Sequence, residues 1–171
     1  MHATKVLMAA IATLIGFGSI VGAQSQTHNS LRMGLAVPAG DTPDSVEFAL
    51  GLDVTYSQLT RNSDLSLSID YLSITSHGVG NATLVPVFLN YRWRSPSDSQ
   101  RKYQWYGGAG MGLYLTDSPI LEMKLDKGTS IAWQAFVGAE ISSSWLLEAR
   151  YMASEDPGAN GLPLLMFGYR F

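Results

Sequence analysis

Apolar and polar residues alternate along most of the chain after about residue 30. A period of two is typical of β-strands with one apolar face, because successive side chains point to opposite faces of a strand. Clusters rich in Gly, Pro, Ser, Asp and Asn separate the alternating segments, as in PAGDTPD, SQLTRNSD and RSPSDSQ. The pattern predicts almost no helix and eight strands, at residues 31–37, 45–57, 64–75, 82–94, 102–116, 129–142, 145–154 and 162–171.

Each predicted strand has one face of large apolar residues and one face of small or charged residues. In the segment 45–57, for example, Leu50 and Leu52 alternate with Gly51 and Asp53. Alternation alone also fits a soluble lipocalin-like barrel with its apolar face inward. However, exposed strand positions do not favour glycine, alanine and serine, whereas a narrow barrel interior has room for little else. We therefore expect the small and charged face to point inward and the apolar face to contact lipid.

Aromatic residues give an independent argument for a membrane barrel. If both termini lie at one rim of an up-and-down barrel, the outward aromatic residues at that rim are Tyr56, Tyr91, Trp93, Tyr103, Trp105, Trp145, Tyr169 and Phe171. The opposite rim then collects Phe48, Tyr71, Trp133 and Tyr151. Because Trp and Tyr prefer the membrane interface, the sequence predicts two aromatic girdles.

The first residues have the pattern of a secretory signal peptide. Lys5 precedes an apolar core at 6–21, and Val21 and Ala23 stand where signal peptidase requires small or short side chains. The core is short for a membrane-spanning anchor, the alternative interpretation. We expect a cleaved signal peptide for Sec-dependent export at 1–23, a linker at 24–30 and a barrel at 31–171.

The composition narrows the class of partner. Only 15% of the 171 residues are charged, which is little for the surface of a water-soluble protein. The net charge of -3, without a basic cluster, argues against nucleic acid. The chain has no cysteine, so it has neither disulfides nor thiolate metal sites.

Four stretches carry a resemblance to a known family: LVPVFLNYRW, WYGGAGMGLYLT, AFVGAEISSSWLLEARYM and the closing MFGYRF. The chain resembles the small eight-stranded outer-membrane β-barrels, the OmpA/OmpX-like superfamily. The resemblance implies an all-β fold, an eight-stranded antiparallel up-and-down transmembrane β-barrel in a Gram-negative outer membrane, in contact with its lipid. It also implies that the barrel-assembly machinery recognises the terminal aromatic residues Phe167, Tyr169 and Phe171.

Charged residues of the inward face are expected to form a salt-bridge network in the lumen. Its expected members are Arg32, Glu47, Asp53, Asp70, Arg92, Glu140, Glu148, Arg150 and Arg170. The signs nearly balance, as a low-dielectric interior requires. A narrow path for a small ion is the alternative, but an eight-stranded barrel is only just wide enough for its own side chains.

No catalytic constellation stands out. Glu140 and Glu148 are candidate paired carboxylates, but we expect Arg150 and Arg92 to pair with them first. Small outer-membrane barrels include lipid A deacylases, yet Ser76-His77-Gly78 does not match the His-x-Ser-Asn pattern expected of that family. The two histidines left after cleavage are too scattered for a metal site. We therefore expect no enzymatic activity and no cofactor.

Several local features leave alternatives open. Pro86 and Pro163 each remove a ladder hydrogen bond, which indicates either bulges or a weak seam through which a small hydrophobic ligand leaves sideways. The segment ILEMKL at 120–125 predicts a strand extension or a contact for such a ligand. The glycines of GGAGMG are expected to let the strand bend or to face a bulky neighbour. Leu72 and Ile74 break the alternation, which predicts a bulge near Tyr71.

Overall fold

The structure is a computed structural model that describes residues 29–36, 47–76, 80–96, 103–116, 128–155 and 161–171. The expected signal peptide at 1–23, most of the linker and the segment ILEMKL lie outside these residues. No helix in the described part is long and apolar enough to cross a membrane.

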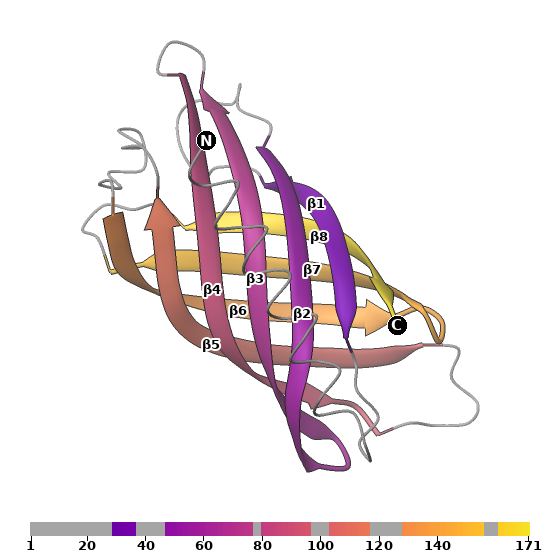
Figure 1. Cartoon of the computed structure of the whole chain (residues 1–171). Helices are drawn as coiled ribbons and strands as arrows, with labels where there is room; N and C mark the ends of the chain where they lie inside the picture. The colour runs from indigo at the N-terminus through magenta and orange to yellow at the C-terminus, as the bar shows by residue number, and fades with distance from the viewer. Residues whose placement is uncertain (1–28, 37–46, 77–79, 97–102, 117–127, 156–160) are drawn as a thin grey trace.

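Eight strands make up the described fold (Figure 1). They are β1 (Ser30–Ala36), β2 (Glu47–Thr60), β3 (Ser63–Ser76), β4 (Gly80–Arg94), β5 (Gln104–Thr116), β6 (Gly128–Glu140), β7 (Trp145–Ser154) and β8 (Leu162–Arg170). Each strand pairs antiparallel with its neighbours in sequence, and β1 pairs antiparallel with β8. The predicted fold class, an eight-stranded antiparallel up-and-down barrel, is confirmed.

The strand ends differ from the prediction mainly at the hairpin between β2 and β3. The stretch predicted as a turn is largely strand, because β2 continues to Thr60 and β3 already begins at Ser63. Register shifts between Thr55 and Ser57 and between Gln58 and Thr60 absorb the extra length of β2. Ser30, expected in the linker, is the first residue of β1.

The large apolar face points outward. Leu89, Val137 and Leu165, none of which is at a strand end, expose 54%, 54% and 59% of their surface. On the other face, Arg32 and Asp53 are fully buried. A soluble lipocalin-like barrel with its apolar face inward is therefore wrong, since this outer face needs lipid to cover it.

The interior has two halves, which the prediction of a polar lumen missed. We call the rim that carries Asn29, Phe171 and the turns at 61–62 and 141–144 the terminal rim, and the opposite rim the distal rim. Charged residues fill the half near the terminal rim. The half near the distal rim holds an apolar plug, formed by Ala49, Leu72, Leu84, Phe88, Tyr114, Ala132, Met152, Leu162, Leu164 and Met166.

Leu72 shows why the predicted bulge near Tyr71 is wrong. The register between β2 and β3 is continuous from Phe48, opposite Ser73, to Thr55, opposite Ser66. Leu72 keeps the inward parity of Asp70 and is fully buried in the plug. The apparent break in alternation arises because an apolar residue occupies an inward position.

The two prolines do not form bulges either. Pro86 lies opposite Tyr114 and Pro163 lies opposite Tyr151, both within continuous registers. The cross-strand pairs of β3 and β4 run to Ile69 opposite Val87 and resume in the same register at Leu72. Each strand thus tolerates the missing proline donor without an extra residue.

The glycines of β5 and β6 provide space for aromatic rings inside the barrel. Gly108 lies opposite Phe136, and a Cβ atom at Gly108 would lie 2.5 Å from Cζ of that ring. Gly138 lies opposite Tyr106, and a Cβ atom there would lie 2.4 Å from Cζ of the tyrosine. The expectation that glycines of GGAGMG face bulky neighbours is confirmed at Gly108, and Gly138 shows the same arrangement.

Candidate functional site

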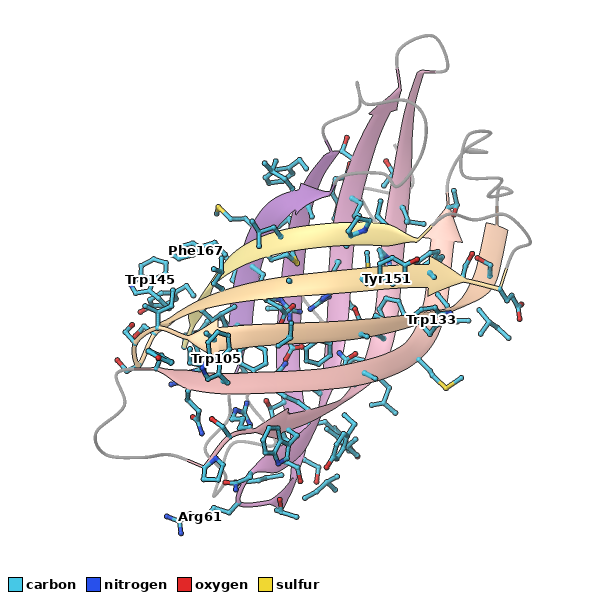
Figure 2. The ribbon with its side chains drawn as sticks, turned by 180° about the vertical axis from the view of Figure 1, so that it is seen from behind. Arg61, Trp105, Trp133, Trp145, Tyr151 and Phe167 are labelled. Carbon is cyan, nitrogen blue, oxygen red and sulfur yellow. The ribbon has the colours of Figure 1, made fainter. Side chains whose placement is uncertain are left out.

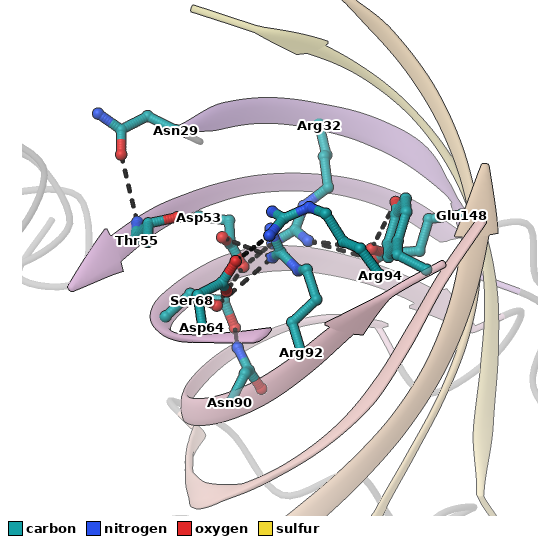
Figure 3. Close-up of polar contacts among 12 residues, drawn as sticks. Asn29, Arg32, Asp53, Thr55, Asp64, Ser68, Asn90, Arg92, Arg94 and Glu148 are labelled. Atoms are coloured by element: carbon teal, nitrogen blue, oxygen red, sulfur yellow. Dashed lines mark hydrogen bonds and ion pairs between the residues drawn. The ribbon is translucent and has the colours of Figure 1, made fainter. Parts of the chain in front are cut away.

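The best-defined polar site is the charge network in the lumen, which contains Arg32 of β1 (Figure 3). We call the part of this network nearer to the plug the middle layer; its members are Arg32, Asp53, Asp70, Arg92, Glu148 and Arg150. Nη1 of Arg32 donates to Oε1 of Glu148 on β7 at 3.2 Å, and its Nη2 lies 3.4 Å from Oδ2 of Asp53 on β2. Asp53 also accepts a hydrogen bond from Nη2 of Arg92 on β4 at 2.7 Å. The guanidinium of Arg32 therefore links β2 with β7 across the lumen.

Arg150 of β7 completes this layer. It donates to Oδ2 of Asp70 and to Oε1 of Glu148, both at 2.6 Å. The hydroxyl of Tyr106 donates to Oε2 of Glu148 at 3.0 Å. Glu148 therefore accepts hydrogen bonds from two guanidinium groups and a phenol, all at buried positions.

Aromatic rings cover two guanidinium groups of the middle layer, those of Arg92 and Arg150. The guanidinium carbon of Arg92 lies 5.5 Å from the ring centroid of Tyr106, and that of Arg150 lies 5.7 Å from the centroid of Phe136. Cation–π contact of this kind is stronger when water is excluded. The rings that Gly108 and Gly138 accommodate thus pack against the charge network.

A second layer of charges lies closer to the terminal rim. Arg94 of β4 forms an ion pair with Asp64 of β3, and its Nε lies 3.3 Å from Oε1 of Glu140 on β6. Glu140 also pairs with Arg170 of β8. The expectation that Arg150 and Arg92 would pair with Glu140 and Glu148 is confirmed for Arg150 and Glu148. It is wrong for Glu140, because both arginines reach the middle layer and Glu140 pairs with Arg94 and Arg170 instead.

Asp64 and Arg94 are members of the network that the sequence analysis missed. Both lie at an end of a predicted strand, where face assignments are least certain. A signal was present, since Asp64 has the parity of Asp70 and Arg94 has the parity of Arg92. Eight of the nine predicted members are inward, and the side chain of Glu47 lies outside the described residues.

Uncharged polar side chains lie between the charges and the plug. The amide nitrogen of Asn90 donates to the Ser68 hydroxyl at 3.0 Å, and the amide of Gln134 donates to Oδ1 of Asn90. All three residues are buried. Polarity therefore decreases in steps from the terminal rim to the plug.

The network has the chemistry of a structural element. Within the described part, five arginines meet five carboxylates, each in at least one ion pair. Buried charges that are paired and hydrogen-bonded are tolerated, whereas an unpaired one is costly. No cluster of potential metal ligands occurs among the described residues, and none of these residues is a histidine.

The predicted girdle residues lie on the outer face (Figure 2). At the terminal rim, the ring of Trp145 stacks on Phe167 at 4.9 Å and meets Tyr169 edge-on at 5.0 Å. At the distal rim, Trp133 and Tyr151 lie 5.6 Å apart. All nine are exposed: Tyr56, Tyr91, Trp93, Tyr103, Trp105, Trp133, Trp145, Tyr151 and Tyr169.

Solved structures with the same architecture are outer-membrane and designed transmembrane barrels. No protein-family model matches the chain, and no curated protein matches it by sequence. The outer membrane enzyme PagL aligns with a TM-score of 0.66 and 11% identity, over 83% of this chain and 98% of that one. Neisserial surface protein A aligns with a TM-score of 0.62 and 15% identity, over 85% and 96% of the two chains.

Two further structures widen the comparison. Ail of Yersinia pestis in a phospholipid nanodisc aligns with a TM-score of 0.54 and 16% identity, over 85% of this chain and all of that one. A de novo designed transmembrane β-barrel aligns with a TM-score of 0.53 and 11% identity, over 86% and 98%. The chain therefore has the fold of the small eight-stranded outer-membrane β-barrels.

At sequence identities this low, the likeness concerns the fold alone, and one fold hosts many functions. One matched structure is an enzyme and another is a designed barrel, so the shared architecture selects no activity. Together with the apolar outer face, the likeness supports an outer-membrane location in contact with lipid.

Proposed function

We propose that the protein is a non-enzymatic outer-membrane barrel of structural type, with a lumen closed to ions and solutes. The observation that carries this proposal is the filling of the interior, with paired charges in one half and the apolar plug in the other. An eight-stranded barrel is only wide enough for its own side chains.

The plug is the main barrier to conduction. Its ten residues come from seven of the eight strands, and none exposes more than 4% of its surface. An ion entering the plug would lose its hydration and meet one polar side-chain group among the ten residues, the Tyr114 hydroxyl, so its desolvation would cost many times the thermal energy. This barrier argues against a narrow channel.

The absence of enzymatic activity is part of the proposal. The likeness to an outer-membrane enzyme concerns the fold. Ser30 follows His28 at the spacing of the His-x-Ser pattern, but Leu31 replaces the asparagine. Ser30 is also 2% exposed and faces the lumen, whereas the deacylase pattern requires a serine on a lipid-facing strand.

The proposal includes two kinds of partner. Lipid covers the outer face, and the two aromatic girdles lie at the membrane interfaces. The barrel-assembly machinery recognises Phe167, Tyr169 and Phe171 before the barrel closes. A small hydrophobic ligand is the alternative from the sequence, but no described residue specifically favours it.

Conductance in planar lipid bilayers tests the proposal directly. The purified protein, inserted from detergent, should give no current steps above the leak of the lipid. A Phe88→Ala/Met166→Ala variant, with a hole in the plug, is the matched control and should conduct in small steps. Regular ion-selective steps from the unaltered protein would overturn the closed lumen.

Two companion measurements check location and chemistry. The expressed protein should appear in the outer-membrane fraction, as a band whose gel mobility changes on boiling in detergent. A soluble band would contradict the membrane assignment. Outer-membrane lipid incubated with the protein should keep its acyl chains by mass spectrometry, and the release of fatty acid would show that the barrel is an enzyme.

A further inference from the structure

The last strand is attached to the barrel very differently on its two sides. On one side lies β7, and residues 141–144 form the turn that joins β6 to β7. On the other side lies β1, which closes the ring. The hydrogen bonds and ion pair of Arg170 described below, and the ring contacts of Phe167 and Tyr169, lie on the β7 side.

Arg170 provides the first group of these contacts. Its guanidinium donates to the backbone carbonyl of Ser143 through Nε at 3.1 Å and through Nη2 at 2.7 Å. Its backbone N–H donates to the carbonyl of Ser144 at 2.6 Å. The same guanidinium forms an ion pair with Glu140 at the end of β6. One residue thus holds the strand end to the whole turn.

Trp145 provides the second group. It is the first residue of β7, and its indole lies against Phe167 and Tyr169 of β8 at 4.9 and 5.0 Å. One contact is stacked, at an interplanar angle of 18°, and the other is edge-on, at 70°. Both are favourable aromatic geometries.

The seam between β8 and β1 has no comparable chemistry. The sequence of β1 is SLRMGLA, which contains no aromatic residue and one charged residue, Arg32. The one charged residue of β8 is Arg170, which has the same sign. Neither an ion pair nor a contact between two aromatic rings can therefore form between these two strands. Their backbone ladder remains, together with contacts of the kind that places Met33 opposite Phe167 and Leu31 opposite Tyr169.

We propose that the β6–β7 hairpin is the docking template for the last strand. The contacts of Trp145 with the rings of β8, and of Arg170 with the turn between β6 and β7, fix β8 in register before β1 closes the barrel. Local pairing precedes pairing between distant segments on general grounds, because closing a long loop costs more entropy. In this barrel, Trp145 and Arg170 are the residues that make the pairing of β8 with β7 specific.

Disulfide formation during folding tests this order, and the absence of cysteine gives a clean background. Leu165 lies directly opposite Ala149 of β7 and opposite Leu35 of β1. Two double variants, Ala149→Cys/Leu165→Cys and Leu35→Cys/Leu165→Cys, therefore share one cysteine. Directly opposed antiparallel residues lie within disulfide reach.

Each variant is unfolded in urea, diluted into phospholipid vesicles without assembly factors, and oxidised and quenched at increasing times. The 149–165 bond should form before the 35–165 bond and before the heat-modifiable band appears. Adding Trp145→Ala should slow formation of the 149–165 bond by roughly two- to tenfold, as the loss of an aromatic pair implies. Trp145→Phe, which keeps a ring, should restore much of the rate.

Trp105→Ala is the matched control, because Trp105 is equally exposed at the same rim but contacts Tyr103 on the β5 side. It should leave the 149–165 rate unchanged. An equal delay in both alanine variants, or a 35–165 bond that forms first or simultaneously, would overturn the proposal. If Trp145→Ala does not fold, Trp145→Leu replaces it, and a 149–165 rate equal to that of the tryptophan-containing variant overturns the proposal, as does a 35–165 bond that forms first.

Discussion

The ring of Phe136 occupies the space that any side chain at Gly108 would need. The two residues are cross-strand partners, and a Cβ atom at Gly108 would lie 2.5 Å from Cζ of Phe136 and 2.2 Å from the backbone oxygen of Tyr91. Tyr106 and Gly138 repeat the arrangement with the strands exchanged. The narrow lumen accepts these rings because the opposing position has no side chain.

Gly108→Ala should therefore destabilise the barrel. The methyl group collides with a backbone atom, which cannot move without shifting the strand, so we expect the free energy of unfolding to fall by about 1–3 kcal/mol. Urea unfolding in lipid vesicles, followed by tryptophan fluorescence, measures the change. Gly107→Ala is the control, because its nearest neighbour would lie at 3.5 Å. Equal stability of the two variants would show that the ring does not need the glycine.

Glu148→Gln should weaken the middle charge layer. The substitution keeps the shape but removes the negative charge that faces Arg32 and Arg150. Breaking a buried ion pair from one side leaves an uncompensated charge, so we expect a loss of about 3–5 kcal/mol in the free energy of unfolding. Glu155→Gln, at an exposed position, should change it by less than about 0.5 kcal/mol under the same conditions.

A charge placed on the outer face distinguishes lipid from water as the surrounding medium. Val137→Arg puts a guanidinium where 54% of the native side chain is exposed. If lipid covers this position, the free energy of unfolding should fall by about 2–4 kcal/mol. Gln58→Arg, on the exposed hairpin at the terminal rim, should be nearly neutral. No effect at Val137 would place this face in water.

Leu72→Ala should open a cavity in the plug. Leu72 is fully buried, so the free energy of unfolding should fall by about 2–5 kcal/mol. The neighbouring Ser73→Ala, on the outward face, should cost far less. Comparable losses at the two positions would mean that Leu72 does not face the lumen.

The sequence predicted the barrel because its signal is repeated in every strand. Alternation, turn clusters and the placement of the aromatic residues are local properties, and they required no knowledge of which strands pair. Eight strands in up-and-down order follow from them, and the described part of the chain has this topology, with Asn29 and Phe171 at one rim. The ends of β2 and β3 were less predictable, because β2 continues past register shifts at Tyr56 and Leu59 through the polar residues Ser57, Gln58 and Thr60.

The interior was predicted only in part, for a physical reason. The assignment assumed that a narrow lumen holds small or charged residues, which is correct near Asp53 and Arg92. It failed at Phe88 and Met166, because glycine and alanine on other strands leave room for large side chains. Such compensation depends on which residues lie opposite one another, and a single sequence does not reveal this before the register is known.

The balance of charges in the lumen has an electrical consequence. Each of the five guanidinium groups in the described interior is matched by a carboxylate, so the inner layers carry no net charge within the bilayer. A voltage across a membrane does work only on charge that moves through its field. The described charge layers offer such a field no net charge to displace, and this part of the barrel should keep its shape when the potential across the membrane changes.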